Sequence, residues 1–243
     1  LFRNPSFRLL FTSLLLFASA AGLNAALNTH VAVFVWKLRP ESIQILTYAL
    51  LIGITASIPI TPPLLRRVEK RTAVMIGYAL VMLAWVTLPL LYVAGLFTPQ
   101  GEAAVTWMAV TMLVAGLGSG IIFIAYPSMM ADAADEHEHR FGVRREGLYF
   151  AGLGFAQKAA AGLGTLLGGV ALDVLNFPRE AGRQVNAVLS GDVLSSLLIA
   201  WGPAPAVLSI VGALLFLPYS ISRARHEAVL ADLRLRRQRE ASA

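Results

Sequence analysis

The sequence is dominated by long apolar runs that are separated by short polar segments. Hydrophobic residues make up 57% of the 243 residues and charged residues only 14%, against about 25% in soluble domains. About 30 Å of hydrocarbon needs roughly 20 apolar residues of helix. Runs of that length cover residues 7–36, 43–65, 72–97, 104–131, 146–175 and 195–221. The sequence therefore predicts an all-α membrane protein with six transmembrane helices, followed by a basic tail at 222–243.

Basic residues are distributed unevenly between the two ends of these predicted spans. Six crossings place both termini on one side, and that side holds Arg3, Arg8, Arg66, Arg67, Lys70, Arg71, Arg140, Arg144, Arg145 and the arginines of the tail. The opposite side holds Lys37, Arg39, Arg179 and Arg183. Because Lys and Arg favour cytoplasmic loops, we expect a multi-pass protein of the cell (inner) membrane with both termini in the cytoplasm.

The net charge of +6 fits the anionic surface of a bilayer, and we expect no nucleic-acid partner. In the tail, Val229, Leu230 and Leu233 share one helical side among arginines. This pattern predicts a basic helix that lies on the inner leaflet.

Lys158 is a lone cation within the predicted span 146–175. It lies about 18 Å from the cytoplasmic start of this span, close to the membrane midplane, which is too deep for its side chain to reach either interface. A charge at this depth costs at least a few kcal/mol unless it faces water or a partner. We therefore expect Lys158 to face a cavity. Small residues that share its helical side, Gly154 among them, favour either close approach of another helix or a water-filled cleft.

Polar and aromatic residues in other spans give weaker signals. Asn24 and Asn28 are one helical turn apart in the first span, where they could make interhelical hydrogen bonds or line a polar pathway. Phe123 and Tyr126 follow a glycine-rich segment of the fourth span. Aromatic rings beside a cleft suit stacking on a sugar, although rings at helical spacing also serve in packing.

The segment 132–145 mixes acids, histidines and arginines between the fourth and fifth predicted spans. Asp132 follows the end of a predicted helix, where a negative charge is unfavourable against the helix dipole, so we expect a cationic partner such as Arg144 or Arg145. An ion-pair network at the cytoplasmic mouth is the preferred interpretation. The spacing of His137 and His139 matches no standard zinc pattern, so we predict no metal site.

Patterns typical of enzymes are missing from the sequence. It contains no cysteine, no phosphate loop and no dinucleotide fingerprint. Gly118-Ser119-Gly120 lacks the preceding glycine that an intramembrane serine protease would have. We predict that the protein is not an enzyme and needs no cofactor.

The charged motifs resemble a known family of transporters. Ala131-Asp132-x-x-Asp135, Val143-Arg144-x-Glu146 and Lys158 twelve residues later are similar to the pattern of the glycoside–pentoside–hexuronide:cation symporters, in their C-terminal half. The opening Phe2-Arg3-Asn4-Pro5-x-Phe7 resembles the entry to the seventh helix of that family.

The resemblance implies a fold and a set of functional residues. The fold would be one six-helix half of a major facilitator transporter, whose two halves bind a sugar between them and rock to give alternating access. Lys158 matches a central lysine near the sugar and cation sites, Phe123 matches an aromatic position of the sugar cavity, and Gly154 and Gln157 match positions that face it. Asp132, Asp135, Arg144 and Glu146 match a cytoplasmic gate, next to which lies Arg145.

We therefore expect the C-terminal half of a transporter that carries a sugar or glycoside together with Na⁺, Li⁺ or H⁺. The carboxylates that bind the cation would belong to the missing N-terminal six-helix half. Two alternatives remain open: a six-helix membrane scaffold or sensor that transports nothing, and a lipid-handling transporter of the same fold.

Overall fold

A computed structural model describes residues 1–178 and 189–242, and these residues form helices and no strands. The elements are α1 (Pro5–His30), the π-helix η1 (Val31–Val35), α2 (Pro40–Arg67), α3 (Lys70–Val93), α4 (Glu102–Phe141), α5 (Glu146–Val174), α6 (Gly191–Trp201), α7 (Pro203–Phe216) and α8 (Arg223–Ala241). The fold is all-α, as predicted. Arg179 and Arg183, which were assigned to the outer side, lie outside the described residues.

Five segments of this part of the chain are long and apolar enough to cross a membrane. They are Pro5–Val35, Pro40–Arg67, Lys70–Val93, Glu102–Phe141 and Gly191–Phe216. The predicted span 146–175 corresponds to α5, which has 29 residues but is not among the five, because Gln157 and Lys158 at its middle lower its hydropathy. The number of six spans therefore stays a prediction.

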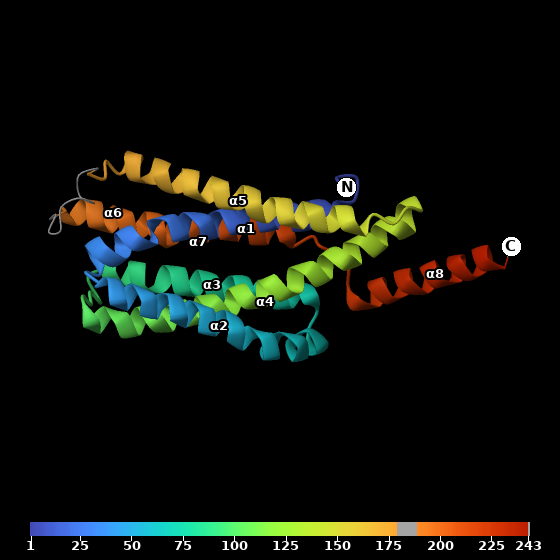
Figure 1. Cartoon of the computed structure of the whole chain (residues 1–243), viewed down its shortest axis with the longest axis horizontal. Helices are drawn as coiled ribbons and strands as arrows, with labels where there is room; N and C mark the ends of the chain where they lie inside the picture. Colours follow the sequence, from blue (N-terminus) through green and yellow to red (C-terminus); the bar gives the residue numbers. More distant parts are fainter. Residues whose placement is uncertain (179–188, 243) are drawn as a thin grey trace.

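The helices run back and forth along one long axis, and the two termini lie at the same end of the bundle (Figure 1). At that end α1 begins where Pro5 follows Asn4, whose side chain caps the helix by accepting a hydrogen bond from the Ser6 amide at 2.8 Å. The same side chain donates to the Ala133 carbonyl at 3.1 Å. The Asn-Pro pair at the start of the chain thus fixes α1 to α4.

Glycines allow two pairs of helices to pack with their backbones in contact. α4 packs on α2 and α3, and α1 packs on α5 and α7. A side chain at Gly116 of α4 would overlap the Leu50 carbonyl of α2, and one at Gly22 of α1 would lie 2.9 Å from Gly164 Cα of α5. Both crossings use small residues in the way that membrane helices commonly do.

The fourth helix is longer than predicted. The sequence predicted a span at 104–131 followed by a loop, but α4 continues to Phe141, so that Asp132–Phe141 forms a helical projection, here called the α4 extension. Its carboxylates pair with Lys70 of α3 and with Arg225 and Arg237 of α8. The extension ends at Gly142, which adopts a left-handed conformation with φ of +70°.

The tail helix α8 lies beside this extension and beyond the end of the bundle (Figure 1). Its side chains Val229 and Leu233 are buried. The prediction that this side of the tail rests on the inner leaflet is therefore wrong for this structure: the partner of the apolar side is protein.

Candidate functional site

Lys158 lies on a side of α5 that no other described helix covers. The buried side of α5 packs on α1 through Leu153, Ala156 and Ala160. Lys158 is exposed, and among the residues that the structure describes it has no hydrogen bond or ion pair. A lysine at the middle of an otherwise apolar helix is thus left without a partner from this chain.

The small residues around Lys158 also face open space. A side chain added at Gly154, Gly162 or Gly169 would meet no atom within 4 Å. The glycine contact between α5 and α1, at Gly164, lies on a different side of the helix. The small-residue face of Lys158 is therefore not used for packing within the described part of the chain.

The other predicted substrate residues divide into exposed and buried positions. Gln157 and Phe123 are exposed, although Gln157 is turned about 100° from Lys158 around the helix. Tyr126 is only 1% exposed: its hydroxyl lies 2.8 Å from Ser13 Oγ and 3.1 Å from the Tyr78 hydroxyl. The interpretation of Tyr126 as a sugar-stacking residue is wrong for this conformation, because the ring packs in the core.

The two asparagines of α1 also differ. Asn24 donates from Nδ2 to the Trp201 carbonyl at 2.7 Å, at the break between α6 and α7. That carbonyl has no helical donor, because the residue four positions later is Pro205, which lacks an N–H group. Asn24 therefore makes an interhelical hydrogen bond, which is one of the two roles that the sequence left open. The Oδ1 atom of Asn28 is buried without a hydrogen-bond partner among the described residues.

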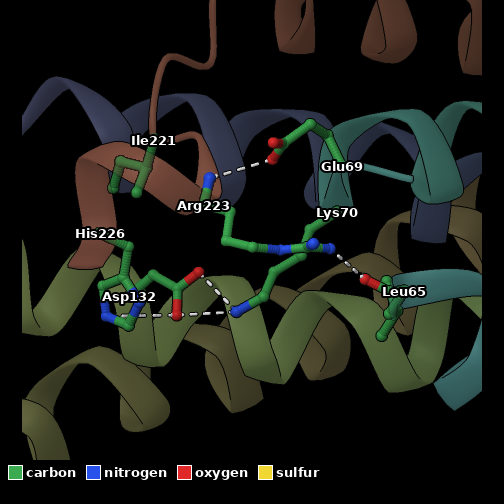
Figure 2. A pocket seen from close by; sticks show the side chains of 7 residues that line it. All are labelled: Leu65, Glu69, Lys70, Asp132, Ile221, Arg223 and His226. Atoms are coloured by element: carbon green, nitrogen blue, oxygen red, sulfur yellow. Dashed lines mark hydrogen bonds and ion pairs between the residues drawn. The ribbon is translucent and has the colours of Figure 1, made fainter. Parts of the chain in front are cut away.

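The predicted gate residues lie at the end of the bundle that carries both termini. Figure 2 shows Asp132 facing Lys70 of α3 and His226 of α8. The Lys70 Nζ atom lies 2.6 Å from Asp132 Oδ2, and His226 Nε2 lies 3.6 Å from Asp132 Oδ1 and 3.0 Å from Asp135 Oδ2. Asp132 does have a cationic partner, but it is Lys70 and not the predicted Arg144 or Arg145.

Arg144 belongs to a second group of ion pairs at the start of α5. Its Nη2 atom lies 2.6 Å from Glu146 and its Nη1 atom 3.4 Å from Glu138 of the α4 extension. The hydrogen bond to Glu146 raises the pKa of the Arg144 guanidinium above its ordinary value. Arg145 precedes the first residue of α5 and makes no ion pair among the described residues. The five predicted gate residues thus form two separate clusters and one unpaired arginine.

Sequence reasoning counted Glu136 as one acid of the mixed segment 132–145 but did not single it out, although it is the most buried carboxylate of the α4 extension. It is 2% exposed and accepts hydrogen bonds from Ser6 Oγ at 2.6 Å, Arg140 at 2.9 Å and Arg225 at 2.9 Å. It therefore connects α1, α4 and α8. A signal was present: the carboxylates at 132 and 136 are one helical turn apart, which places them on one side of a helix if the segment is helical.

The first residue of α8, Arg223, makes hydrogen bonds to the turn between α2 and α3. Arg223 donates to the carbonyls of Leu65 at 2.7 Å and Arg66 at 3.2 Å, and its backbone amide donates to Glu69 at 3.1 Å. Figure 2 shows this guanidinium reaching the Leu65 carbonyl at the end of α2, where unpaired carbonyls favour a cation. Further along, Arg237 pairs with Glu138 at 2.6 Å and His139 with Asp232 at 3.0 Å. The tail helix thus bridges α2, α3 and α4.

Replacing Glu136 by Gln should loosen α8. The substitution keeps the shape of the side chain but removes the charge that Arg140 and Arg225 share, and hydrogen bonds to a charged group are worth about 1.5–3 kcal/mol. We expect amide hydrogen exchange in residues 222–242 to become at least about tenfold faster. Glu227→Gln is the matched control, since Glu227 is exposed on α8 itself and should leave exchange unchanged. Equal exchange in both variants would mean that Glu136 does not hold the tail.

The two histidines of the α4 extension, His137 and His139, make different contacts. The described residues contain no group of three or more His, Cys, Asp or Glu side chains that could hold a metal ion. His137 packs against Phe141 and Tyr149, with ring centroids 4.6 and 5.5 Å away. His139 instead pairs with α8, so the two histidines serve different contacts.

Comparison with known proteins gives one family and several relatives. The model of a family described as MFS/sugar transport protein matches residues 1–223. The chain is 30% identical to an uncharacterized symporter of Synechocystis sp. over 60% of the chain and 26% of the relative. It is 24% identical to an isoprimeverose transporter of Lactiplantibacillus pentosus over 88% of the chain and 42% of the relative. It is 29% identical to the sodium-dependent lysophosphatidylcholine symporter 1 of Mus musculus over 79% of the chain and 34% of the relative. In each case the match spans less than half of the relative's length.

Proposed function

Because the chain belongs to the MFS/sugar transport protein family, we propose that it forms the C-terminal half of a secondary transporter that carries a sugar or glycoside together with a cation. The other half would supply six further helices, and the substrate would bind between the halves near the membrane midplane. The protein would lie in the cell (inner) membrane with both termini in the cytoplasm, as the distribution of arginines and lysines favours.

The observation that carries this proposal is the position of Lys158. It is exposed at the middle of an apolar helix, on a side that no described helix covers. A lysine at that depth is too costly to face lipid, so its side of α5 is best explained as a wall of the central cavity. The unpaired ammonium would face the carboxylates of the other half and the hydroxyl groups of the sugar.

Coupling would follow from a change in the partners of Lys158. Without a cation, the ammonium would pair with the carboxylates of the other half. When Na⁺, Li⁺ or H⁺ binds to these carboxylates, Lys158 would lose that partner and become free to donate to sugar hydroxyls. The affinity for the sugar would thereby depend on the bound cation, as linkage requires.

The ion pairs at the end that carries both termini would form the inner gate. Asp132 and Asp135 would be held by Lys70 and His226 in the conformation described here, and Arg144 would be held by Glu138 and Glu146. Rocking of the two halves would rearrange these pairs. The Arg144–Glu146 pair is exposed on both sides, and exposed ion pairs contribute only about 0–1 kcal/mol.

A lipid-handling transporter is the second candidate. It is favoured by the similarity to the lysophosphatidylcholine symporter, which extends over 79% of the chain. The same lysine could then face the polar head of a lipid.

Flux in proteoliposomes separates these candidates. The complete protein would be reconstituted and given either isoprimeverose or lysophosphatidylcholine as the probe, under an inward gradient of Na⁺, Li⁺ or H⁺. Accumulation of isoprimeverose that depends on one gradient supports sugar symport. Gradient-dependent movement of lysophosphatidylcholine alone supports the lipid candidate. Movement of neither probe would contradict both and favour a membrane scaffold or sensor.

A further inference from the structure

Phe155 is a large aromatic side chain that is left exposed next to Lys158. It lies one helical turn before Lys158 on α5, and 64% of its surface is exposed. The following inference rests on the proposed function, because it assigns this ring a part in the same cavity.

The ring of Phe155 is supported from one side by α1. It is stacked on Phe11, with ring centroids 6.4 Å apart and an angle of 9° between the planes. Phe11 in turn stacks on Phe7 at 5.7 Å, and Phe7 is fully buried, with its ring edge-on to Tyr149 at 4.9 Å. Phe155 is therefore the outer end of an aromatic row that is anchored in the core, which fixes the orientation of its ring.

The exposed side of Phe155 points into the same sector as Lys158. At 100° per residue the two side chains are about 60° apart around the helix axis. Because the lysine cannot face hydrocarbon without a cost of at least a few kcal/mol, this sector of α5 faces the cavity and not the lipid. The ring therefore belongs to the cavity wall.

Space for a ligand is left beside the ring. Gly162 lies one turn after Lys158 and Gly154 one turn before it, and a side chain at either position would meet no atom within 4 Å. The wall thus consists of a flat apolar ring, a cation and a floor without side chains. Such a combination of apolar surface with one directed polar group is typical of small-molecule sites.

We propose that Phe155 is a specificity-determining residue that binds the apolar C–H face of a sugar ring, while Lys158 donates to its hydroxyl groups. A pyranose has one face of C–H groups and a rim of hydroxyls, which matches an aromatic ring with a donor next to it. An acyl chain would need the apolar area of Phe155 but not its aromatic face.

Two substitutions separate the aromatic face from the apolar area. Phe155→Leu keeps an apolar side chain and removes the ring, whereas Phe155→Trp keeps an aromatic face. We expect the Kd of the complete protein for isoprimeverose, measured by calorimetry, to rise about tenfold in Phe155→Leu and to stay within about threefold in Phe155→Trp. Phe150→Leu is the matched control, since Phe150 is exposed but lies about 140° from Phe155 around the same helix, and it should bind as the unchanged protein does.

The outcomes have distinct meanings. Isoprimeverose binding that is equally tight in Phe155→Leu and in the unchanged protein would overturn the inference and leave the proposed function intact. A lower Tm and weaker binding in Phe155→Trp, with Phe155→Leu unaffected, would show that the ring packs against another helix, which also overturns it. If the unchanged protein binds no sugar, the proposed function and this inference fail together.

Discussion

Replacing Lys158 by Ala should abolish the accumulation of substrate against its gradient. Breaking a buried ion pair by removing one partner costs about 3–5 kcal/mol, and 3 kcal/mol corresponds to roughly a hundredfold. We expect gradient-driven uptake of isoprimeverose by the complete protein in proteoliposomes to fall by about that factor. The reason is that, in the proposed mechanism, cation binding changes the partner of the Lys158 ammonium and thereby changes the affinity for the sugar.

Two controls make this result specific. Lys37→Ala removes an exposed lysine that lies between η1 and α2, at the end of the bundle away from both termini. This substitution should leave uptake unchanged. Size-exclusion chromatography of Lys158→Ala should give the same monodisperse peak as the unchanged protein, because Lys158 makes no contact that holds the described helices together. Undiminished accumulation in Lys158→Ala would exclude its role in coupling.

Replacing Gly116 by Ala should destabilise the bundle more than a single methyl group usually does. The new Cβ atom would overlap the backbone carbonyl of Leu50 on α2, and a backbone cannot move aside as a flexible side chain can. Overpacking of this kind costs about 3 kcal/mol at the upper end of its usual range, so we expect the apparent Tm in detergent to fall by roughly 10 °C.

Gly169→Ala is the matched control for this substitution. Gly169 lies in a helix, as Gly116 does, but a side chain there meets no atom within 4 Å. Its Tm should stay the same or rise slightly, since Ala favours helix over Gly. If both variants had the same Tm, the close contact between α2 and α4 would not contribute to stability.

Much of the fold could be predicted from hydropathy alone. The lengths of five apolar runs indicated helices that are long and apolar enough to cross a membrane, because the thickness of a bilayer sets that length. They could not indicate where a helix continues past its apolar run, as α4 does to Phe141. The carboxylates of that extension pair with Lys70 and Arg225, which are distant in sequence.

The candidate site shows the same division. Lys158 could be singled out from the sequence because a lone charge in an apolar run is conspicuous, and its role in a cavity stays a prediction. The burial of Tyr126 could not, since it depends on hydroxyl groups of Ser13 and Tyr78 in two other helices. The partners of Asp132 were missed for a related reason: nearby arginines were considered, but the observed partners come from α3 and α8.

Because α4 is long, a small tilt displaces its ends by several ångströms. Its 40 residues correspond to about 60 Å, twice the hydrocarbon thickness. A tilt of about 10° around its middle would move each end by about 5 Å and Asp132, which lies about 16 Å from the middle, by about 3 Å. Such a shift would carry the Asp132–Lys70 pair, now 2.6 Å apart, beyond hydrogen-bond distance. A small rotation within the membrane would thus be amplified into an all-or-none change of partners outside it.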